Sequence, residues 1–294
     1  METAELLKKV RKIEIKTRGL SRNIFAGEYH SAFKGRGMSF SEVREYQYGD
    51  DIRNIDWNVT ARFNHPYVKI YEEERELTVM LLVDVSQSRV FGTQQQLKKN
   101  LITEISAVLS FSAIENNDKI GVIMFSDKVE KFIPPKKGRK HILRIIRELI
   151  EFNPDSPGTD IAGVLKYITN AIKKRCTAFL LSDFLDQDAE NNKLNYEEAL
   201  RIANNKHDLI GLQIYDKRET ELPPVGIINV QDAETGETLW VDSSNSSVRN
   251  AYKHWWNNTN NLIKTTFSQA GVDYETIATN QDYVKPLVNL FKRR

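Results

Sequence analysis

LTVMLLVDVSQS, residues 77–88, holds the pattern from which the architecture of the whole chain can be inferred. Residues 77–83 are apolar or β-branched without a break, which is typical of a strand buried on both faces of a parallel sheet. Asp84, Ser86 and Ser88 then follow at every second position. Open α/β sheets bind ligands at the carboxyl ends of their strands. Three oxygen-bearing side chains at such an end suit a hard cation such as Mg²⁺.

Strands and helices alternate along the chain after this stretch. Apolar runs predict further buried strands over Ile120–Phe125, Val129–Ile133, Thr177–Leu181, Leu209–Tyr215 and Val272–Ala278. Apolar residues at helical spacing predict helices over Gln94–Glu115, around Ile142–Leu149 and Ile161–Ile172, and over Tyr196–Asn204, Asn250–Gln269 and Tyr283–Phe291. This alternation predicts an α/β fold with a doubly wound, mostly parallel sheet of Rossmann type.

One segment, residues 217–249, interrupts the alternation. Within it, a turn with the sequence AETGE separates two short β-forming runs, Gly226–Val230 and Thr238–Val241. This pattern predicts a β-hairpin. We therefore expect a single α/β domain over residues 77–294, with the hairpin as an insertion.

Residues 1–76 differ from the rest, and we expect them to form a small N-terminal subdomain rich in strands and loops. Residues 1–13 predict a short amphipathic helix. Aromatic residues and glycines punctuate residues 14–76 without a helical period, which favours short strands and turns. Basic and acidic residues are interleaved with aromatic residues between Arg44 and Arg62. They fit a structural network of Arg–carboxylate pairs, which we favour for the individual residues, or a docking surface.

Composition sets the class of protein. The chain has 294 residues, a net charge of +2 and a pI of about 8.4, which is too balanced to favour nucleic acid as a partner. The single cysteine, Cys176, excludes an internal disulfide. The N-terminus lacks the apolar core of a signal peptide, and no apolar run reaches the length of a membrane span. We therefore expect a cytoplasmic protein with no membrane span.

Five residues on three predicted loops form a candidate metal site: Asp84, Ser86, Ser88, Thr159 and Asp183. In a sheet of order 3-2-1-4-5-6, the first and fourth strands are neighbours, and a crevice opens between their carboxyl ends. Two carboxylates there would balance a divalent cation, and hydroxyl ligands would add no charge. Mg²⁺ fits because it uses few protein carboxylates, and Mn²⁺ is an alternative. Each residue alone also fits an ordinary turn or helix cap.

At these residues the chain resembles a von Willebrand factor type A domain with its metal-ion-dependent adhesion site. The resemblance covers residues 77–294. It implies that Ser86, Ser88 and Thr159 bind the metal directly, and that the two aspartates contact it mainly through water. It further implies that a protein partner completes the metal shell with an acidic side chain. The sequence departs from the pattern at Phe184, where many relatives have glycine; this restricts the loop but keeps Asp183 in place.

A narrower resemblance covers most of the chain. Three segments resemble the bacterial domain-of-unknown-function family fifty-eight: GEYHSAFKGRGMSFSEVREYQYGDDIRNIDWNVTAR, YEEERELTVMLLVDVSQS and ELPPVGIINVQDAETGE. The resemblance implies a partner, an AAA+ ATPase of the MoxR type, and a role in complex assembly or protein maturation. It implies no catalytic activity, and it assigns no role to Gly49-Asp50-Asp51 or to Asp56-Trp57.

Two functions follow from this site. The first is an Mg²⁺-dependent protein-binding adaptor, which is not an enzyme. The alternative is a metal-dependent hydrolase of phosphatase type with Asp84 as nucleophile. Ser86 stands where a second carboxylate would help that chemistry, and no histidine lies beside the three loops. The chain also lacks a GxxxxGK[ST] phosphate-binding loop, so we do not expect it to hydrolyse ATP. A third interpretation is a scaffold with a vestigial site.

Overall fold

A computed structural model describes residues 11, 13, 39–72, 77–90, 97–188, 193–232 and 236–294. The predicted helix over residues 1–13 lies outside the described residues except at positions 11 and 13. The described chain divides into two compact units, one within Phe33–Leu77 and the other from Thr78 to Arg294.

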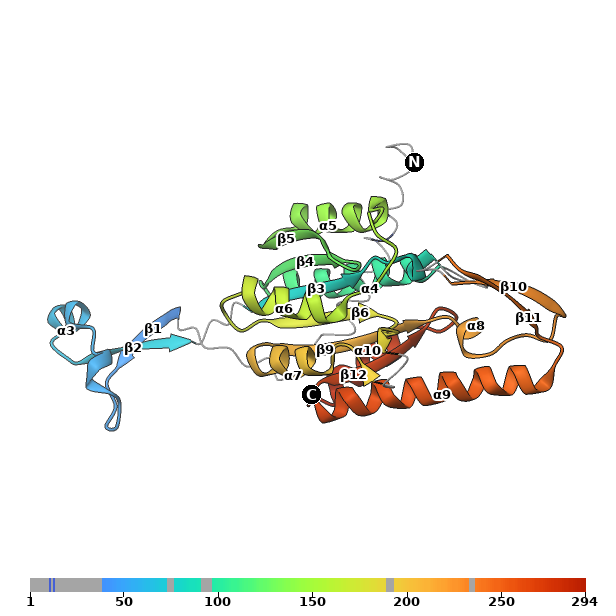
Figure 1. Ribbon diagram of the computed structural model, residues 1–294. Coiled ribbons are helices and arrows are strands. Elements are labelled where there is room, and N and C mark those ends of the chain that lie inside the picture. The colour runs from blue at the N-terminus through green and yellow to red at the C-terminus, as the bar shows by residue number, and fades with distance from the viewer. Residues whose placement is uncertain are drawn as a thin grey trace. The chain divides into compact units, whose positions relative to one another are not determined.

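A six-stranded sheet forms the centre of the larger unit (Figure 1). Its spatial order is β12-β9-β6-β3-β4-β5, and only the β4–β5 pair is antiparallel. Counted along the chain this is the order 3-2-1-4-5-6, so the predicted doubly wound, mostly parallel sheet is confirmed. The strands are β3 (Thr78–Asp84), β4 (Lys119–Phe125), β5 (Val129–Lys136), β6 (Thr177–Ser182), β9 (Asp208–Tyr215) and β12 (Asp273–Ala278). The third strand continues through Pro134-Pro135 because β5 is an edge strand, where proline is tolerated.

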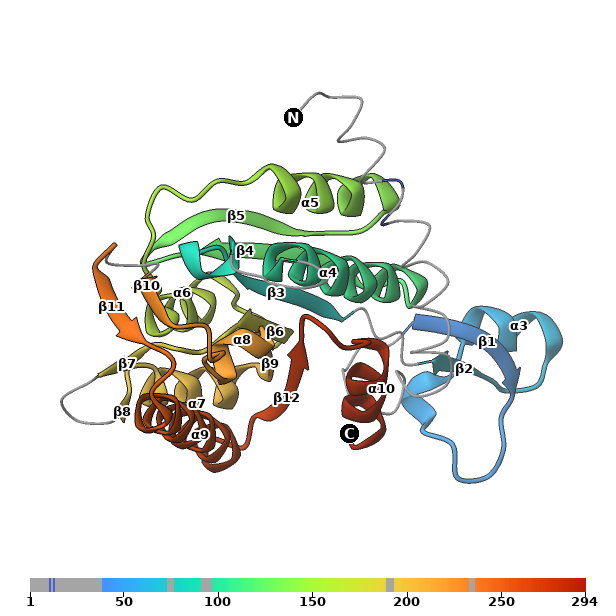
Figure 2. The ribbon, with the colours of Figure 1, turned by 90° about the vertical axis from the view of Figure 1, so that its right-hand side faces the viewer.

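Helices cover both faces of the sheet, as a doubly wound fold requires (Figure 2). One face carries α4 (Lys98–Glu115), α5 (Arg139–Glu151) and α10 (Val284–Lys292); the other carries α6 (Ile161–Ala171), α7 (Glu197–Lys206) and α9 (Ser246–Gln269). The side chains of Met80 and Leu82 on β3 are fully buried. Burying each such side chain contributes about 1.5–3 kcal/mol. The sheet is therefore a rigid base for the loops at its edges.

Close packing under the carboxyl edge depends on one glycine. A Cβ atom on Gly211 of β9 would lie 2.3 Å from Cε1 of Phe267 on α9. The Phe267 ring also packs at 4.8 Å from the ring of Phe184, which follows β6. The position therefore accepts no side chain, and α9 lies close enough to support the loop after β6.

The predicted hairpin insertion is present. β10 (Ile227–Gln231) pairs with β11 (Thr238–Asp242) in an antiparallel register that places Asn229 opposite Trp240. A short helix, α8 (Lys217–Thr220), precedes it, and a two-stranded ribbon of β7 (Gln187–Asp188) and β8 (Lys193–Leu194) follows β6. None of the helices in the described ranges is long and apolar enough to cross a membrane.

The smaller unit is a ribbon with two short helices. β1 (Ser39–Glu45) and β2 (Tyr67–Glu72) are antiparallel and joined through η1 (Ile52–Asn54) and α3 (Trp57–Phe63). The sequence indicated only strands and turns here, because a seven-residue helix shows no period. Arg44 donates to both carboxylate oxygens of Asp50 at 2.8 Å, as expected of the charged network. Asp56 forms an ion pair with Lys69 at 3.5 Å and also caps α3, accepting from the backbone N–H groups of Asn58 and Val59.

We predict that Asp56→Ala loosens α3 whereas Arg53→Ala does not. Asp56 caps the helix, and the loss of such a cap increases opening about fivefold. Arg53 is exposed, and its side chain forms no hydrogen bond or ion pair with the residues that the structure describes. Amide hydrogen exchange across residues 57–63 measures the difference. Equal exchange in both variants would assign Asp56 to another role, such as partner binding.

Candidate metal centre

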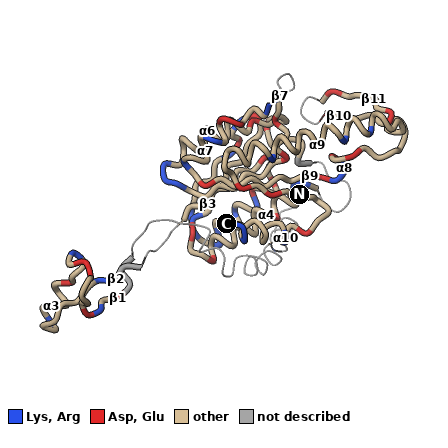
Figure 3. Tube along the Cα trace, turned by 90° about the horizontal axis from the view of Figure 1, so that it is seen from below, with Lys and Arg blue, Asp and Glu red and all other residues tan. Residues whose placement is uncertain are grey.

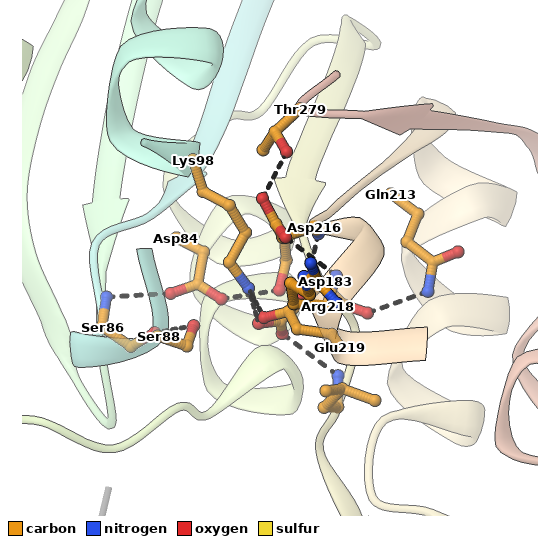
Figure 4. A network of polar contacts seen from close by, with 12 residues as sticks. Asp84, Ser86, Ser88, Lys98, Asp183, Gln213, Asp216, Arg218, Glu219 and Thr279 are labelled. Carbon is orange, nitrogen blue, oxygen red and sulfur yellow. Dashed lines mark hydrogen bonds and ion pairs between the residues drawn. The ribbon is translucent and has the colours of Figure 1, made fainter. Parts of the chain in front are cut away.

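Asp84 lies at the end of β3, between the two neighbouring strands β4 and β6, and only 2% of its surface is exposed. Its Oδ1 accepts the backbone N–H of Ser86 at 2.9 Å, and its Oδ2 accepts the hydroxyl of Ser182 at 2.6 Å (Figure 4). The first bond closes a tight turn directly after the strand. The second joins the ends of β3 and β6. The carboxylate is therefore held in one orientation at the carboxyl edge of the sheet.

Ser86 and Ser88 stand on that turn with their hydroxyl oxygens 3.1 Å apart. Ser86 is fully buried and Ser88 is half-buried in the short helix η2 (Gln87–Val90). The backbone before them is fixed because the N–H of Val85 donates to the carbonyl of Phe125 at 2.8 Å. The alternation seen in the sequence thus places both hydroxyls on one side of the turn.

Thr159 is half-buried on the loop before α6. Two backbone hydrogen bonds hold this loop at the same edge of the sheet. The N–H of Gln87 donates to the carbonyl of Pro157 at 3.1 Å. The N–H of Asp160 donates to the carbonyl of Ser126 at 2.8 Å. The N-cap of α6 is Asp160, whose Oδ1 accepts from Gly163 at 2.8 Å. Helix capping therefore accounts for Asp160 and not for Thr159.

Asp183 follows β6 and is 7% exposed. Its Oδ2 accepts from Nζ of Lys98 at 3.0 Å and its Oδ1 from the N–H of Leu185 at 3.3 Å. Gln213 of β9 donates to its carbonyl oxygen at 3.1 Å. The structure thus brings Asp183 to the edge where Asp84 lies, as the strand order predicted.

Phe184 takes the backbone conformation that the sequence departure called into question. Its φ is +63°, in the left-handed region that favours glycine. Burial of the ring offsets this cost, since Phe184 is fully buried against Phe267 and Tyr196. The backbone N–H of Phe184 donates to the hydroxyl of Ser182. The backbone carbonyl of Phe184 accepts from the hydroxyl of Tyr196. The loop keeps the glycine-like conformation with a phenylalanine because its side chain is an anchor.

Two charged residues at the site were not anticipated from the sequence. Lys98, the first residue of α4, is 1% exposed, and its Nζ lies 3.0 Å from Asp183 and 2.5 Å from Oε1 of Glu219. Glu219 belongs to α8, 121 positions away from Lys98 along the chain. No local pattern marks such a pair. The strand order alone could have placed Lys98 near Asp183, because the helix after the first strand begins beside the fourth strand.

The buried charges perturb one another. Burial, followed by the charge of Asp183, raises the pKa of Asp84 to about 6. Burial also acts to raise the pKa of Asp183, but the Lys98 ammonium outweighs it and holds that pKa below its usual value. Burial acts to lower the pKa of Lys98, yet the two carboxylates beside it raise it. The three carboxylates of Asp84, Asp183 and Glu219 and the one ammonium of Lys98 therefore leave the edge with excess negative charge when all are ionised.

The donor set fits a hard divalent cation. It offers carboxylate and hydroxyl oxygens, which Mg²⁺ and Mn²⁺ prefer, and no thiolate or imidazole. Within the described ranges no group of three or more His, Cys, Asp or Glu side chains could hold a metal. A cation here would therefore need the hydroxyls of Ser86, Ser88 and Thr159, with Asp84 and Asp183 supplying the charge.

Comparisons with known proteins agree with the fold. A crystal structure of an aerotolerance-related membrane protein from Bacteroides fragilis superposes with a TM-score of 0.51 at 12% identity, covering 74% of this chain and 100% of that chain. The uncharacterized protein Rv1480 of Mycobacterium tuberculosis is 29% identical over 239 residues, which are 80% of this chain and 73% of that protein. The uncharacterized protein YeaD of Bacillus subtilis is 26% identical over 109 residues, 37% of this chain and 25% of that protein.

A family model described as "Protein of unknown function DUF58" matches residues 42–261. The match spans most of the β1–β2 ribbon, the sheet from β3 to β9, and the hairpin insertion. It includes all five residues of the candidate metal centre. The chain belongs to the DUF58 family.

Proposed function

We propose that the chain is a protein-binding module that depends on a divalent metal, held by Asp84, Ser86, Ser88, Thr159 and Asp183. The convergence of these residues on one edge of the sheet carries the proposal. Mg²⁺ is the proposed metal, with Mn²⁺ as an alternative. The metal would supply a Lewis-acidic centre able to accept a further oxygen ligand.

The charges favour a carboxylate as that further ligand. Asp84 and Asp183 balance a divalent cation, and three hydroxyls add coordination without charge. Lys98 and Glu219 form an ion pair at 2.5 Å and balance each other, so the metal keeps a vacant coordination position in a centre without excess negative charge. Such a centre attracts an anionic oxygen, and we infer that the partner donates an acidic side chain. Acidic and basic residues are interspersed along the described chain (Figure 3), which gives no preference for a polyanion such as nucleic acid.

We propose that the partner is an AAA+ ATPase of the MoxR type and that the module acts with it, in the cytoplasm, in complex assembly or protein maturation. The support for this partner is the resemblance of the charged–aromatic segment of residues 27–62 and of the strand after it. Exposed aromatic side chains on the smaller unit, Trp57 at 70% and Tyr48, offer a second surface for such a partner.

We propose binding rather than catalysis at this edge. Both carboxylate oxygens of Asp84 already accept hydrogen bonds, which weakens it as a nucleophile. Two of the histidines are engaged elsewhere: His141 contacts the carbonyl of Ile120, and His207 contacts Cys176. Assay of the purified protein with p-nitrophenyl phosphate and Mn²⁺ tests the phosphatase alternative, and turnover lost in Asp84→Asn would establish it.

We predict that Asp84→Asn abolishes Mg²⁺ binding and metal-dependent partner binding with little change in fold. Asparagine retains an oxygen for the N–H of Ser86 but removes the negative charge. Asp127→Asn is the matched control, because Asp127 is an exposed carboxylate after the neighbouring strand β4 and lies outside the motif. Calorimetry with Mg²⁺ and biolayer interferometry with a purified MoxR-type ATPase of the same organism measure the two effects.

Four results separate the possible outcomes. Partner binding by wild type and Asp127→Asn, but not by Asp84→Asn, is the expected result. Equal binding by all three proteins in Mg²⁺ and in EDTA would contradict the adhesion-site proposal and move attention to the smaller unit. Absence of Mg²⁺ and Mn²⁺ binding by wild type would contradict the metal itself. Binding of metal without the ATPase would contradict only the choice of partner.

We expect the affinity of the site for Mg²⁺ to decrease when the pH is lower than about 6. Asp84 has a pKa of about 6 in the folded protein, against an ordinary value of 3.8. Protonation of Asp84 therefore stabilises the folded state at low pH. This contribution to stability is lost as the pH rises from about 4 to about 6. A cation that needs the carboxylate must displace this proton at low pH. Affinity should be flat from pH 7 to 8 and should then weaken by up to about tenfold per pH unit below 6. Calorimetry across this range checks it.

Ser182→Ala provides an internal comparison for the pH experiment. The Ser182 hydroxyl donates to Oδ2 of Asp84 at 2.6 Å and lowers its pKa. Its removal should move the loss of affinity to higher pH. An affinity that stays constant from pH 5 to 8 in both proteins would show that no proton leaves Asp84 on binding.

A further inference from the structure

A buried ammonium group sits where the proposed metal site needs negative charge. Lys98 is 1% exposed and donates to Oδ2 of Asp183 at 3.0 Å and to Oε1 of Glu219 at 2.5 Å. Figure 4 shows its side chain reaching from the start of α4 to the space between the two carboxylates. Asp183 belongs to the five-residue motif, whereas Glu219 does not. One cation is thus shared between a proposed metal-site residue and a residue of the insertion.

Glu219 is a fixed acceptor rather than a loose surface side chain. Its Oε2 accepts the N–H of Asp216 at 2.7 Å, which forms the capping box of α8. Its backbone carbonyl accepts the hydroxyl of Tyr252 on α9 at 3.0 Å. Asp216 is itself buried and bound to Thr279 after β12. The fold therefore holds Glu219 beside Lys98 whether or not Asp183 takes part.

The four charged side chains at this edge of the sheet are electrically neutral in sum only when a divalent cation is added. Asp84, Asp183 and Glu219 contribute three negative charges when ionised, and Lys98 contributes one positive charge. A divalent cation removes the remaining imbalance of two. Without it, Lys98 is the only positively charged residue in the described part of the chain that forms an ion pair with Asp183. The ammonium and a divalent cation therefore attract the same carboxylate.

Resting on the proposed metal site, we propose that Lys98 is a tethered cation that competes with the divalent metal for Asp183, and that Glu219 retains the ammonium when the metal is bound. Breaking a buried ion pair is costly when it leaves a charge unpaired. Here Lys98 keeps Glu219 after releasing Asp183, so no buried charge is stranded. The pair thereby sets the metal affinity of the site and links it to the 217–249 insertion. Lys98 and Glu219 act as positioning residues.

We predict that substitutions of Lys98 and of Glu219 shift the affinity for Mg²⁺ in opposite directions. Lys98→Met removes the competing cation, and the dissociation constant for Mg²⁺ should fall about tenfold or more, since a charge at this range changes an ionic equilibrium by that factor. Glu219→Gln removes the alternative acceptor and should raise the constant by a factor of about ten. Calorimetry with Mg²⁺ alone, on the full chain, measures both. Thermal unfolding with and without Mg²⁺ gives a second readout.

Matched controls lie next to both residues. Lys99→Met makes the same change one position along α4, where Nζ is directed to the carbonyl of Phe152 at 3.4 Å. Glu221→Gln makes the same change just beyond α8, at an exposed position. Both controls should bind Mg²⁺ as wild type does. The stabilisation by Mg²⁺ should be larger in Lys98→Met than in wild type, because metal alone can then neutralise Asp183.

The outcomes separate this inference from the proposed function. If wild type binds Mg²⁺ and both variants bind with the same constant, while their unfolding temperatures fall equally with and without Mg²⁺, the pair is only structural and the inference is wrong. If Lys98→Met binds Mg²⁺ about tenfold more tightly than wild type and Glu219→Gln binds it more weakly, the competition is confirmed. If neither protein binds Mg²⁺ or Mn²⁺, the metal site itself is wrong. If Lys98→Met fails to fold, Glu219→Gln decides the question.

Discussion

The parallel pairing of β3 with β6 is the constraint on which the candidate centre depends. Its register sets Val83 opposite Leu181, so both strands end together and the hydroxyl of Ser182 reaches Asp84 at 2.6 Å. The residues that follow the two strands, on turns that leave the sheet, then lie at one edge. A slip of one residue would turn Asp84 toward the opposite face. The hydrogen bond from Ser182 to Asp84 forms only in the observed register, so it favours the alignment that positions the site.

Buried charge explains why the edge contains more than the five-residue motif. Burial, and then the charge of Asp183, raises the pKa of Asp84, while the Lys98 ammonium holds the pKa of Asp183 below its usual value. Each buried charge needs a partner, and the fold supplies these from the loop after β6, from α4 and from α8. The hairpin insertion is therefore electrostatically part of the centre, through Glu219, although it lies outside the central sheet.

The sequence was sufficient for those features that follow from short-range patterns and strand order. The buried run before Asp84, the alternation of strands and helices, and the hairpin at residues 227–242 were all predicted, and the order 3-2-1-4-5-6 brought Asp183 to the edge of Asp84. Helix α3 was missed because its signal is a cap at Asp56 and not a period. Lys98 and Glu219 were missed because 121 positions separate them and only the tertiary fold makes them neighbours.

Phe184 shows how the core also sets the geometry of the loop. A positive φ at a residue with a large side chain is unfavourable in isolation. Here the ring is buried against Phe267, which approaches the sheet closely because Gly211 has no side chain. Hydrophobic burial thus stabilises the turn that presents Asp183, where a glycine would leave that turn free to move. The site gains rigidity from the apolar core directly beneath it, and a rigid edge holds carboxylates and hydroxyls in place before a cation arrives.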